Sequence, residues 1–220
     1  MQSVKVVAVS NPTIDGMGVD EFIAYVARVS NPSNQMNTQT APKLLKYLAK
    51  HKHWSPFEMV SICMEIDTTR DIARQILRHR SFSFQEFSQR YADPTKDLGF
   101  VTREARLQDL KNRQNSIETD DENLQEVWDE WQAGVLDEAR IAYTWAIQNG
   151  IAKEQARAVL PEGLTQSRMY MNGTLRSWIH YCELRMGVET QKEHREIALM
   201  AWDEITKVFP SLTDVLSDTK

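Results

Sequence analysis

The sequence Arg78-His79-Arg80-Ser81-Phe82-Ser83-Phe84-Gln85-Glu86-Phe87-Ser88-Gln89-Arg90-Tyr91 joins an expected helix to an extended segment. Its three arginines, one histidine and one carboxylate lie among three phenylalanines, so we expect it to be partly buried. Buried charge is costly unless it is paired or bound to a ligand. Three arginines facing the single carboxylate of Glu86 leave positive charge over, and a guanidinium matches phosphate or carboxylate in two-point contacts. The stretch therefore predicts a site for an anionic ligand, with a solvated basic turn as the alternative.

The residues before this stretch predict the helix that leads into it. Thr68-Thr69-Arg70-Asp71 has the pattern of a capping box. Gln75 lies three residues before Arg78 and four before His79, so all three share one surface near the end of the helix. The helix dipole favours cations at that end, which gives the arginines a partly structural role as well.

Other elements follow from hydrophobic periodicity and from glycine and proline signals. Strands are expected at residues 4–9 and 59–66, and helices at 20–29, 44–48, 124–146, 153–160, 174–186 and 190–208. Asn172 or Thr174 is expected to cap the helix that ends before Gly187. Residues 94–120 are polar and predict a loop or lid with helical parts. The tryptophans of the long helix are assigned to the core, with a subunit contact as the alternative. Without a repeat or linker, residues 1–220 are expected to form one helix-rich α+β domain, a mixed β-sheet surrounded by several helices.

Composition limits the classes of function. A formal net charge of −5 argues against a surface that binds polyanions throughout, so an anion site must be local. Cys63 and Cys182 do not form a disulfide framework and fit a reducing compartment. The first residues lack a signal-peptide pattern, and no apolar run approaches the ~18 residues of a membrane span. A cytoplasmic protein without a membrane partner is expected.

Several motifs together resemble the flavin-dependent thymidylate synthases. Arg78-His79-Arg80, followed after seven residues by Ser88-Gln89-Arg90-Tyr91, resembles the signature of that family. Further similar motifs stand in the family's order over residues 25–205. They are Ala27-Arg28-Val29-Ser30, the element from His53 to Glu58, and Glu154 and Arg157 ahead of Leu160-Pro161.

This resemblance implies the synthesis of dTMP from dUMP. It implies bound FAD as hydride carrier, methylenetetrahydrofolate as carbon donor and NADPH as reductant. It also implies a homotetramer with shared active sites. The motif contains no cysteine, so thiolate attack on the pyrimidine is not suggested.

The family motifs also imply site residues. Substrate-binding positions are Gln75, Arg78, Glu86, Phe87, Ser88, Gln89, Arg90, Arg157 and Arg185. Cofactor-binding positions are Ser30, His53, Ser55, Glu58, Arg78, His79, Arg80, Gln85, Glu86, Thr174, Arg176 and His180. Arg185 is the catalytic candidate, as an electrostatic partner of the uracil ring. Many relatives have asparagine where Thr174 and His180 stand, and often histidine where Met59 stands.

Arg176 and Arg185 are nine residues apart, about two and a half helical turns, and therefore lie on roughly opposite faces of one helix. One ligand cannot easily meet both side chains from a single chain. Their placement suits an oligomer whose sites are built between subunits.

Two alternatives use other chemistry. Phe82, Phe84 and Phe87 among arginines suggest a module that stacks bases of single-stranded nucleic acid, although the acidic net charge and the lack of a wider basic stripe argue against it. His51, His53 and Glu58 suggest a metal-dependent hydrolase, but a third histidine or cysteine at ligand spacing is missing.

Overall fold

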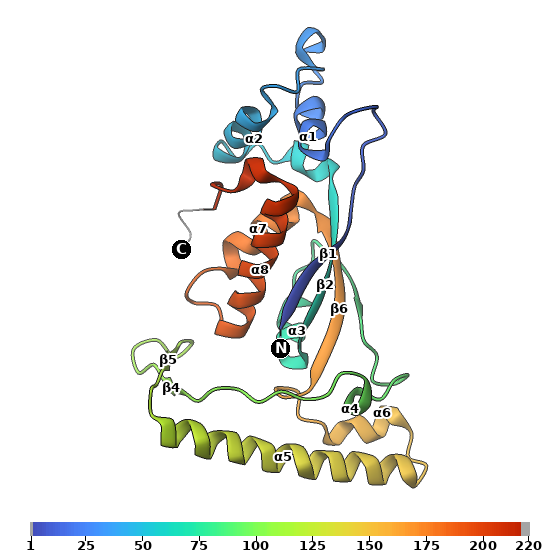
Figure 1. Cartoon of the computed structure of the whole chain (residues 1–220), viewed down its shortest axis with the longest axis vertical. Helices are drawn as coiled ribbons and strands as arrows, with labels where there is room; N and C mark the ends of the chain where they lie inside the picture. The colour runs from blue at the N-terminus through green and yellow to red at the C-terminus, as the bar shows by residue number, and fades with distance from the viewer. Residues whose placement is uncertain (1, 217–220) are drawn as a thin grey trace.

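The computed structural model describes residues 2–216 and centres on a four-stranded sheet with the order β1-β2-β6-β3 (Figure 1). The strands are β1 (Ser3–Val9), β2 (Ser61–Thr69), β6 (Gln166–Thr174) and β3 (Ser83–Glu86). The expected α+β class is confirmed. The expected mixed sheet is wrong, because β1 and β6 both run opposite to β2, and β3 runs opposite to β6. Strand β6 is absent from the sequence prediction.

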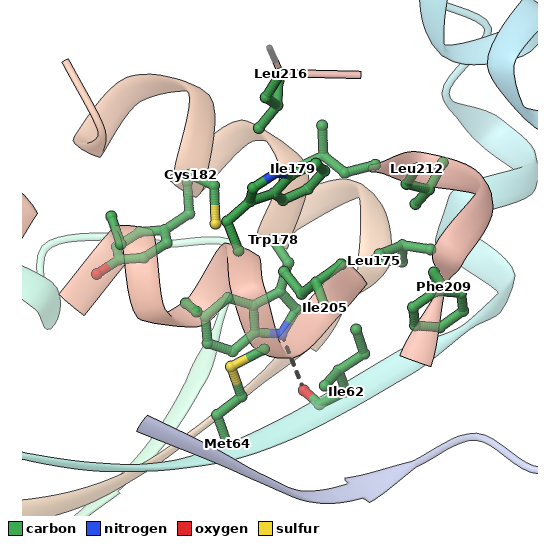
Figure 2. Packing of buried hydrophobic residues seen from close by; sticks show 14 of the residues in the cluster. Ile62, Met64, Leu175, Trp178, Ile179, Cys182, Ile205, Phe209, Leu212 and Leu216 are labelled. Carbon is green, nitrogen blue, oxygen red and sulfur yellow. Dashed lines mark hydrogen bonds between the residues drawn. The ribbon is translucent and has the colours of Figure 1, made fainter. Parts of the chain in front are cut away.

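One face of the sheet forms the core. In β2, Ile62, Met64 and Ile66 are fully buried and alternate with residues on the other face, as period-2 geometry requires. Helices α7 (Leu175–Arg185) and α8 (Lys192–Val208) cover this face (Figure 1). Trp178 of α7 packs beside Ile62 and Met64, and its Nε1 donates to the carbonyl of Ile62 at 3.0 Å (Figure 2). The indole N–H is thus satisfied inside the core.

Further helices and short 3-10 turns complete this part of the chain. They are α1 (Val19–Ala27), α2 (Ala41–Lys50), α3 (Arg70–Ile76) and the 3-10 turns η1 (Pro32–Asn34), η2 (Ser55–Met59) and η4 (Pro210–Leu212). Of the two expected caps, Asn172 and Thr174, it is Thr174 that caps α7, by accepting from the Ser177 amide. The capping box at α3 is wrong. The Thr69 hydroxyl makes no cap hydrogen bond and donates instead to Asp71 at 2.6 Å.

Residues 94–120, predicted as a loop or lid with helical parts, contain regular secondary structure. They hold the short helix α4 (Pro94–Asp97) and a two-stranded ribbon, β4 (Arg106–Gln108) with β5 (Ser116–Glu118). The ribbon is tied to α8 by an Arg106–Glu193 ion pair and by Lys192, which contacts Glu118 at 2.6 Å.

Helix α5 (Glu122–Gln148) lies at one end of the long axis, away from the sheet, beside α6 (Lys153–Ala156) and η3 (Arg157–Val159) (Figure 1). Its buried side, including Tyr143 and Ala146, forms a small second cluster. The assignment of its tryptophans to the core is wrong, since Trp131 is 70% exposed and Trp145 59%. In the part of the chain that the structure describes, no helix combines the length and apolar character that a membrane span needs.

Candidate active site

Phe82 anchors the turn between α3 and β3, residues 78–82 and here called the arginine-rich turn, to the sheet. Its ring packs on Trp178 with a centroid distance of 4.9 Å and faces Gly173 of β6. A Cβ at residue 173 would lie 2.4 Å from a ring carbon of Phe82, so glycine is required for this approach. Phe82 and Phe84 pack inward onto the core, with their ring centroids 6.2 Å apart, and do not form an exposed stacking surface.

The arginines of the turn are open to solvent. Arg78 and Arg80 are exposed, and within residues 2–216 neither forms an ion pair with a carboxylate. The expectation that they face Glu86 is wrong. Because β3 carries it to α3, Glu86 contacts Arg70 at 3.4 Å and Arg74 at 3.1 Å, and it accepts from Ser167 at 2.8 Å. Two guanidiniums of the turn therefore remain available for an anion.

A second cluster joins the segment after β3 to α6 and η3. Arg90 pairs with Glu154 at 3.3 Å, while Arg157 donates to the Glu154 carbonyl at 3.3 Å. Arg157 is close enough to lower the pKa of Arg70, although burial is the larger cause. Gln89 is only 4% exposed, and its Nε2 has no partner among the described residues. An unsatisfied buried donor of this kind calls for an acceptor from outside the chain.

The remaining predicted residues of this segment are distributed around β3. Gln85 is exposed on the strand, the Phe87 amide donates to the Arg168 carbonyl at 2.8 Å, and the Ser88 hydroxyl accepts weakly from the Arg90 amide at 3.4 Å. The Ser88 hydroxyl forms no relay with a histidine or carboxylate within residues 2–216.

Arg185 and His79 are brought together by α7 and the end of α3. Arg185 Nε donates to His79 Nε2 at 2.9 Å. The pKa of His79 is lowered to about 4, mainly by burial and further by the charges of Arg185 and Arg78, so the ring is a neutral acceptor. Within residues 2–216, no side chain bonds the two terminal nitrogens of Arg185. His79 therefore orients the guanidinium of Arg185, and the two terminal nitrogens remain open to a ligand.

Five predicted cofactor residues lie where η2 packs on α7, namely Ser55, Glu58, Thr174, Arg176 and His180. Glu58 forms an ion pair with Arg176, and the rings of Trp54 and His180 lie edge to face with a centroid distance of 5.2 Å. Ser55 opens η2 and is exposed, and Thr174 is occupied as the cap of α7. Between α7 and the arginine-rich turn lies a cavity of about 420 Å³ with His79, Ser81, Ser177, His180 and Tyr181 among its lining residues.

Ser30 and His53 lie near α1 and α2. Ser30 follows α1 and lines a second cavity of about 520 Å³ together with Arg28 and Tyr47. The rings of His53 and Tyr47 are edge to face at 6.2 Å. No group of three potential metal ligands occurs among residues 2–216, and Glu58 is engaged by Arg176. The described residues therefore offer no set of metal ligands for the alternative of a metal-dependent hydrolase.

Sequence reasoning missed several residues next to these groups. Arg70 and Arg74 hold Glu86, and Gln75 contacts Gln191 and His194 of the α8 region. The spacing of Arg70 and Arg74 along α3 shows that they share a face, but not that Glu86 would meet it.

Open arginine forks, an orphaned amide donor and cavities lined by hydroxyls and imidazoles define a protein that binds anionic small molecules. Residues 13–211 match the family described as thymidylate synthase complementing protein, Thy1. The chain belongs to this family, the flavin-dependent thymidylate synthases.

Named relatives agree with this assignment, and a solved structure shares the fold. The chain is 47% identical over 215 residues to a probable flavin-dependent thymidylate synthase of Paramecium bursaria Chlorella virus 1, covering 97% of this chain and 98% of that protein. It is also 47% identical over 217 residues to the flavin-dependent thymidylate synthase of Synechocystis, with the same coverage. A UMP/dUMP methylase, PolB from Streptomyces cacaoi, shares the fold with a TM-score of 0.81 at 23% identity, covering 99% of this chain and 95% of that one.

Proposed function

We propose that this chain makes dTMP from dUMP as one domain with bound FAD, taking the carbon from methylenetetrahydrofolate and reducing equivalents from NADPH. The observation that carries this proposal is the guanidinium of Arg185. Its Nε is held by the neutral ring of His79, and its two terminal nitrogens are open to a ligand. The two relatives at 47% identity, matched over nearly their whole lengths, carry the corresponding name.

The chain's residues fit a flavin with an anionic tail. Arg78 and Arg80 offer guanidiniums that no carboxylate in residues 2–216 neutralises, and Arg176 lies beside the cavity-lining His180 on α7. When bound, FAD supplies hydride transfer, which side chains do not provide. We assign Ser30, His53, Ser55, Glu58, Gln85, Glu86 and Thr174 to the same cofactor environment.

The nucleotide is assigned to the cluster around Gln89. Its buried amide donor lacks a partner among the described residues, and Arg90 and Arg157 both contact Glu154. The phosphate of a nucleoside monophosphate would accept charge-assisted hydrogen bonds from these groups. Phe87 and Ser88 complete this wall, with Ser88 as a binding hydroxyl.

Arg185 is assigned the electrostatic role in the reaction. His79 accepts from Nε and so fixes the plane of the guanidinium, while both terminal nitrogens can donate to the uracil ring. Negative charge that develops on the ring is stabilised by such preorganised donors without reorganisation.

The assembly is proposed to be a homotetramer with shared sites. Ser30 and η2 lie near α1, whereas Arg157 lies beside α5 at the opposite end of the long axis, so one chain does not gather all assigned residues (Figure 1). Helix α5 is about 40 Å long at 1.5 Å per residue and exposes Trp128, Trp131, Val135, Ile141 and Trp145. A second copy is the proposed cover for this apolar face, since large exposed patches mark interfaces.

Subunit mixing tests the shared site. Arg157→Ala and Arg176→Ala variants, each inactive alone, are mixed under conditions that exchange subunits. If the two arginines serve one site from different chains, about a quarter of the sites in a random 1:1 mixture regain both. Confirmed exchange without recovered dTMP formation refutes the shared site. The activity itself is tested by dTMP formation from dUMP, with methylenetetrahydrofolate or NADPH omitted in control reactions.

A further inference from the structure

His194 is a fully buried imidazole for which the proposed reaction has no role. It lies in the first turn of α8, with Nδ1 3.3 Å from Gln75 Oε1 and Nε2 3.1 Å from the Tyr181 hydroxyl. The pKa of His194 is lowered to about 3, mainly by burial and then by the nearby charges of Arg185, His79 and Arg78. The ring is therefore neutral and carries a single N–H.

The hydrogen bonds around His194 have only one consistent direction. Glu193 forms an ion pair with Arg106 and accepts from Gln191 Nε2 at 2.9 Å. A carboxylate only accepts, so this contact fixes the amide of Gln191 with its oxygen toward Gln75. Gln75 Nε2 donates to that oxygen at 2.7 Å, which turns Gln75 Oε1 toward His194.

The same logic fixes the tautomer of His194. Because Gln75 Oε1 is an acceptor, Nδ1 must carry the hydrogen, and Nε2 must accept from the Tyr181 hydroxyl. A continuous chain thus runs from Tyr181 through His194, Gln75 and Gln191 to Glu193. This chain of hydrogen bonds holds both polar atoms of the Gln75 amide. It leaves one hydrogen on Gln75 Nε2 and one lone pair on Gln75 Oε1 unused.

We propose that His194 is a positioning residue that holds the Gln75 side chain so that its unused amide hydrogen and lone pair face the nucleotide. The inference rests on the proposed assignment of Gln75 to the dUMP site. Without the Nδ1 donor, the Gln75 amide loses one of its two anchors and samples flipped orientations, which present the wrong polar group to the base. Binding therefore weakens although His194 never touches the nucleotide.

Two isosteric substitutions separate positioning from packing. In His194→Asn the side-chain amide reaches the place of Nδ1 and can still donate to Gln75. In His194→Gln the longer side chain places its polar atoms near Nε2, where they meet Tyr181 instead. Both remove the imidazole from the core, so a role in packing alone predicts similar nucleotide affinity for the two variants.

The experiment measures the dissociation constant of dUMP by calorimetry on flavin-loaded protein, together with urea midpoints and the KM for NADPH. We expect His194→Gln to raise the dissociation constant about three- to tenfold, the range of one hydrogen bond, and His194→Asn to stay within about twofold. The KM for NADPH should not change in either. Ile205→Val, another fully buried residue of α8, is the matched control that alters packing without touching the chain of hydrogen bonds.

A second variant avoids the core. Gln191→Leu changes a half-buried residue, removes the other anchor of Gln75, and should also weaken dUMP binding about three- to tenfold. Equal affinity of His194→Asn and His194→Gln, or parent affinity in Gln191→Leu, overturns the inference while leaving the proposed function intact. A parent protein that does not bind dUMP refutes the proposed nucleotide site and this inference with it.

Discussion

Replacing Arg185 by alanine should slow the chemical step more than it weakens nucleotide binding. Arg185 uses only Nε within residues 2–216, in its bond to His79, so both terminal nitrogens are free to donate to a ligand. A preorganised donor facing developing charge is worth about 3–4 kcal/mol, or roughly 10²–10³ in rate. An interaction that strengthens toward the transition state lowers turnover and not merely the apparent affinity.

The assay is a single turnover with pre-reduced flavin, saturating dUMP and methylenetetrahydrofolate, followed by flavin absorbance and dTMP formation. It is run near pH 8, well above the pKa of about 4 of His79, so loss of the Arg185 charge leaves that ring neutral. Arg185→Lys should recover little of the rate, because one ammonium cannot contact His79 and a ligand with planar geometry. Reduction of the flavin by NADPH is the control and should stay near normal. Parent-like turnover in Arg185→Ala at saturating dUMP would contradict the catalytic role and leave Arg185 a binding residue.

Three further predictions test the scaffold of the site. Glu86→Ala leaves the nearly buried guanidinium of Arg70 without its closest carboxylate and should cost about 3–5 kcal/mol in urea unfolding, whereas Glu86→Gln should cost less because an acceptor remains. Gly173→Ala places a methyl group 2.4 Å from the Phe82 ring and should reduce the flavin retained per chain after purification; unchanged absorbance would show that Phe82 moves freely. His194 has a pKa of about 3 in the folded chain and 6.5 as its ordinary value, so between these pH values it takes up its proton only on unfolding; its contribution to stability is complete above pH 6.5 and is lost progressively as the pH falls toward 3. The unfolding free energy should fall toward pH 5 by about 1.4 kcal/mol per pH unit from this group, and a His194→Asn variant with the same slope would disprove that origin.

Local pattern predicted the helices of the site well. Gln75, Arg78 and His79 were placed together at the end of one helix, and that helix, α3, extends to Ile76 with the latter two just beyond it. Thr174, one of the two predicted caps with Asn172, caps α7 in the structure, because capping depends on residues within one turn. Arg176 and Arg185 contact different partners, Glu58 and His79, which agrees with their nine-residue separation along α7.

Pairings between distant segments could not be predicted in this way. Glu86 meets Arg70 and Arg74 only because β3 pairs with β6, and β6 itself was missed although Met169 and Met171 alternate with polar residues. The prediction from sequence placed Glu86 with the arginines nearest to it in the chain. Register between strands that are distant in sequence is a tertiary property, and local spacing does not encode it.

The face of α5 illustrates a different limit. Periodicity correctly predicted a long amphipathic helix, Glu122–Gln148 in the structure. It did not say whether the apolar face meets the chain's own core or another molecule, since both uses require the same side chains. The exposure of Trp131 and Trp145 excludes the first use within the described residues.

The most direct test of the central claim is the yield of dTMP per bound flavin in one anaerobic turnover. The purified protein, with its flavin reduced in advance and no NADPH present, is mixed with dUMP and methylenetetrahydrofolate. Flavin-dependent thymidylate synthesis predicts about one dTMP per flavin, formed as the oxidised flavin absorbance returns. No dTMP, or dTMP formed in full while the flavin stays reduced, would contradict it.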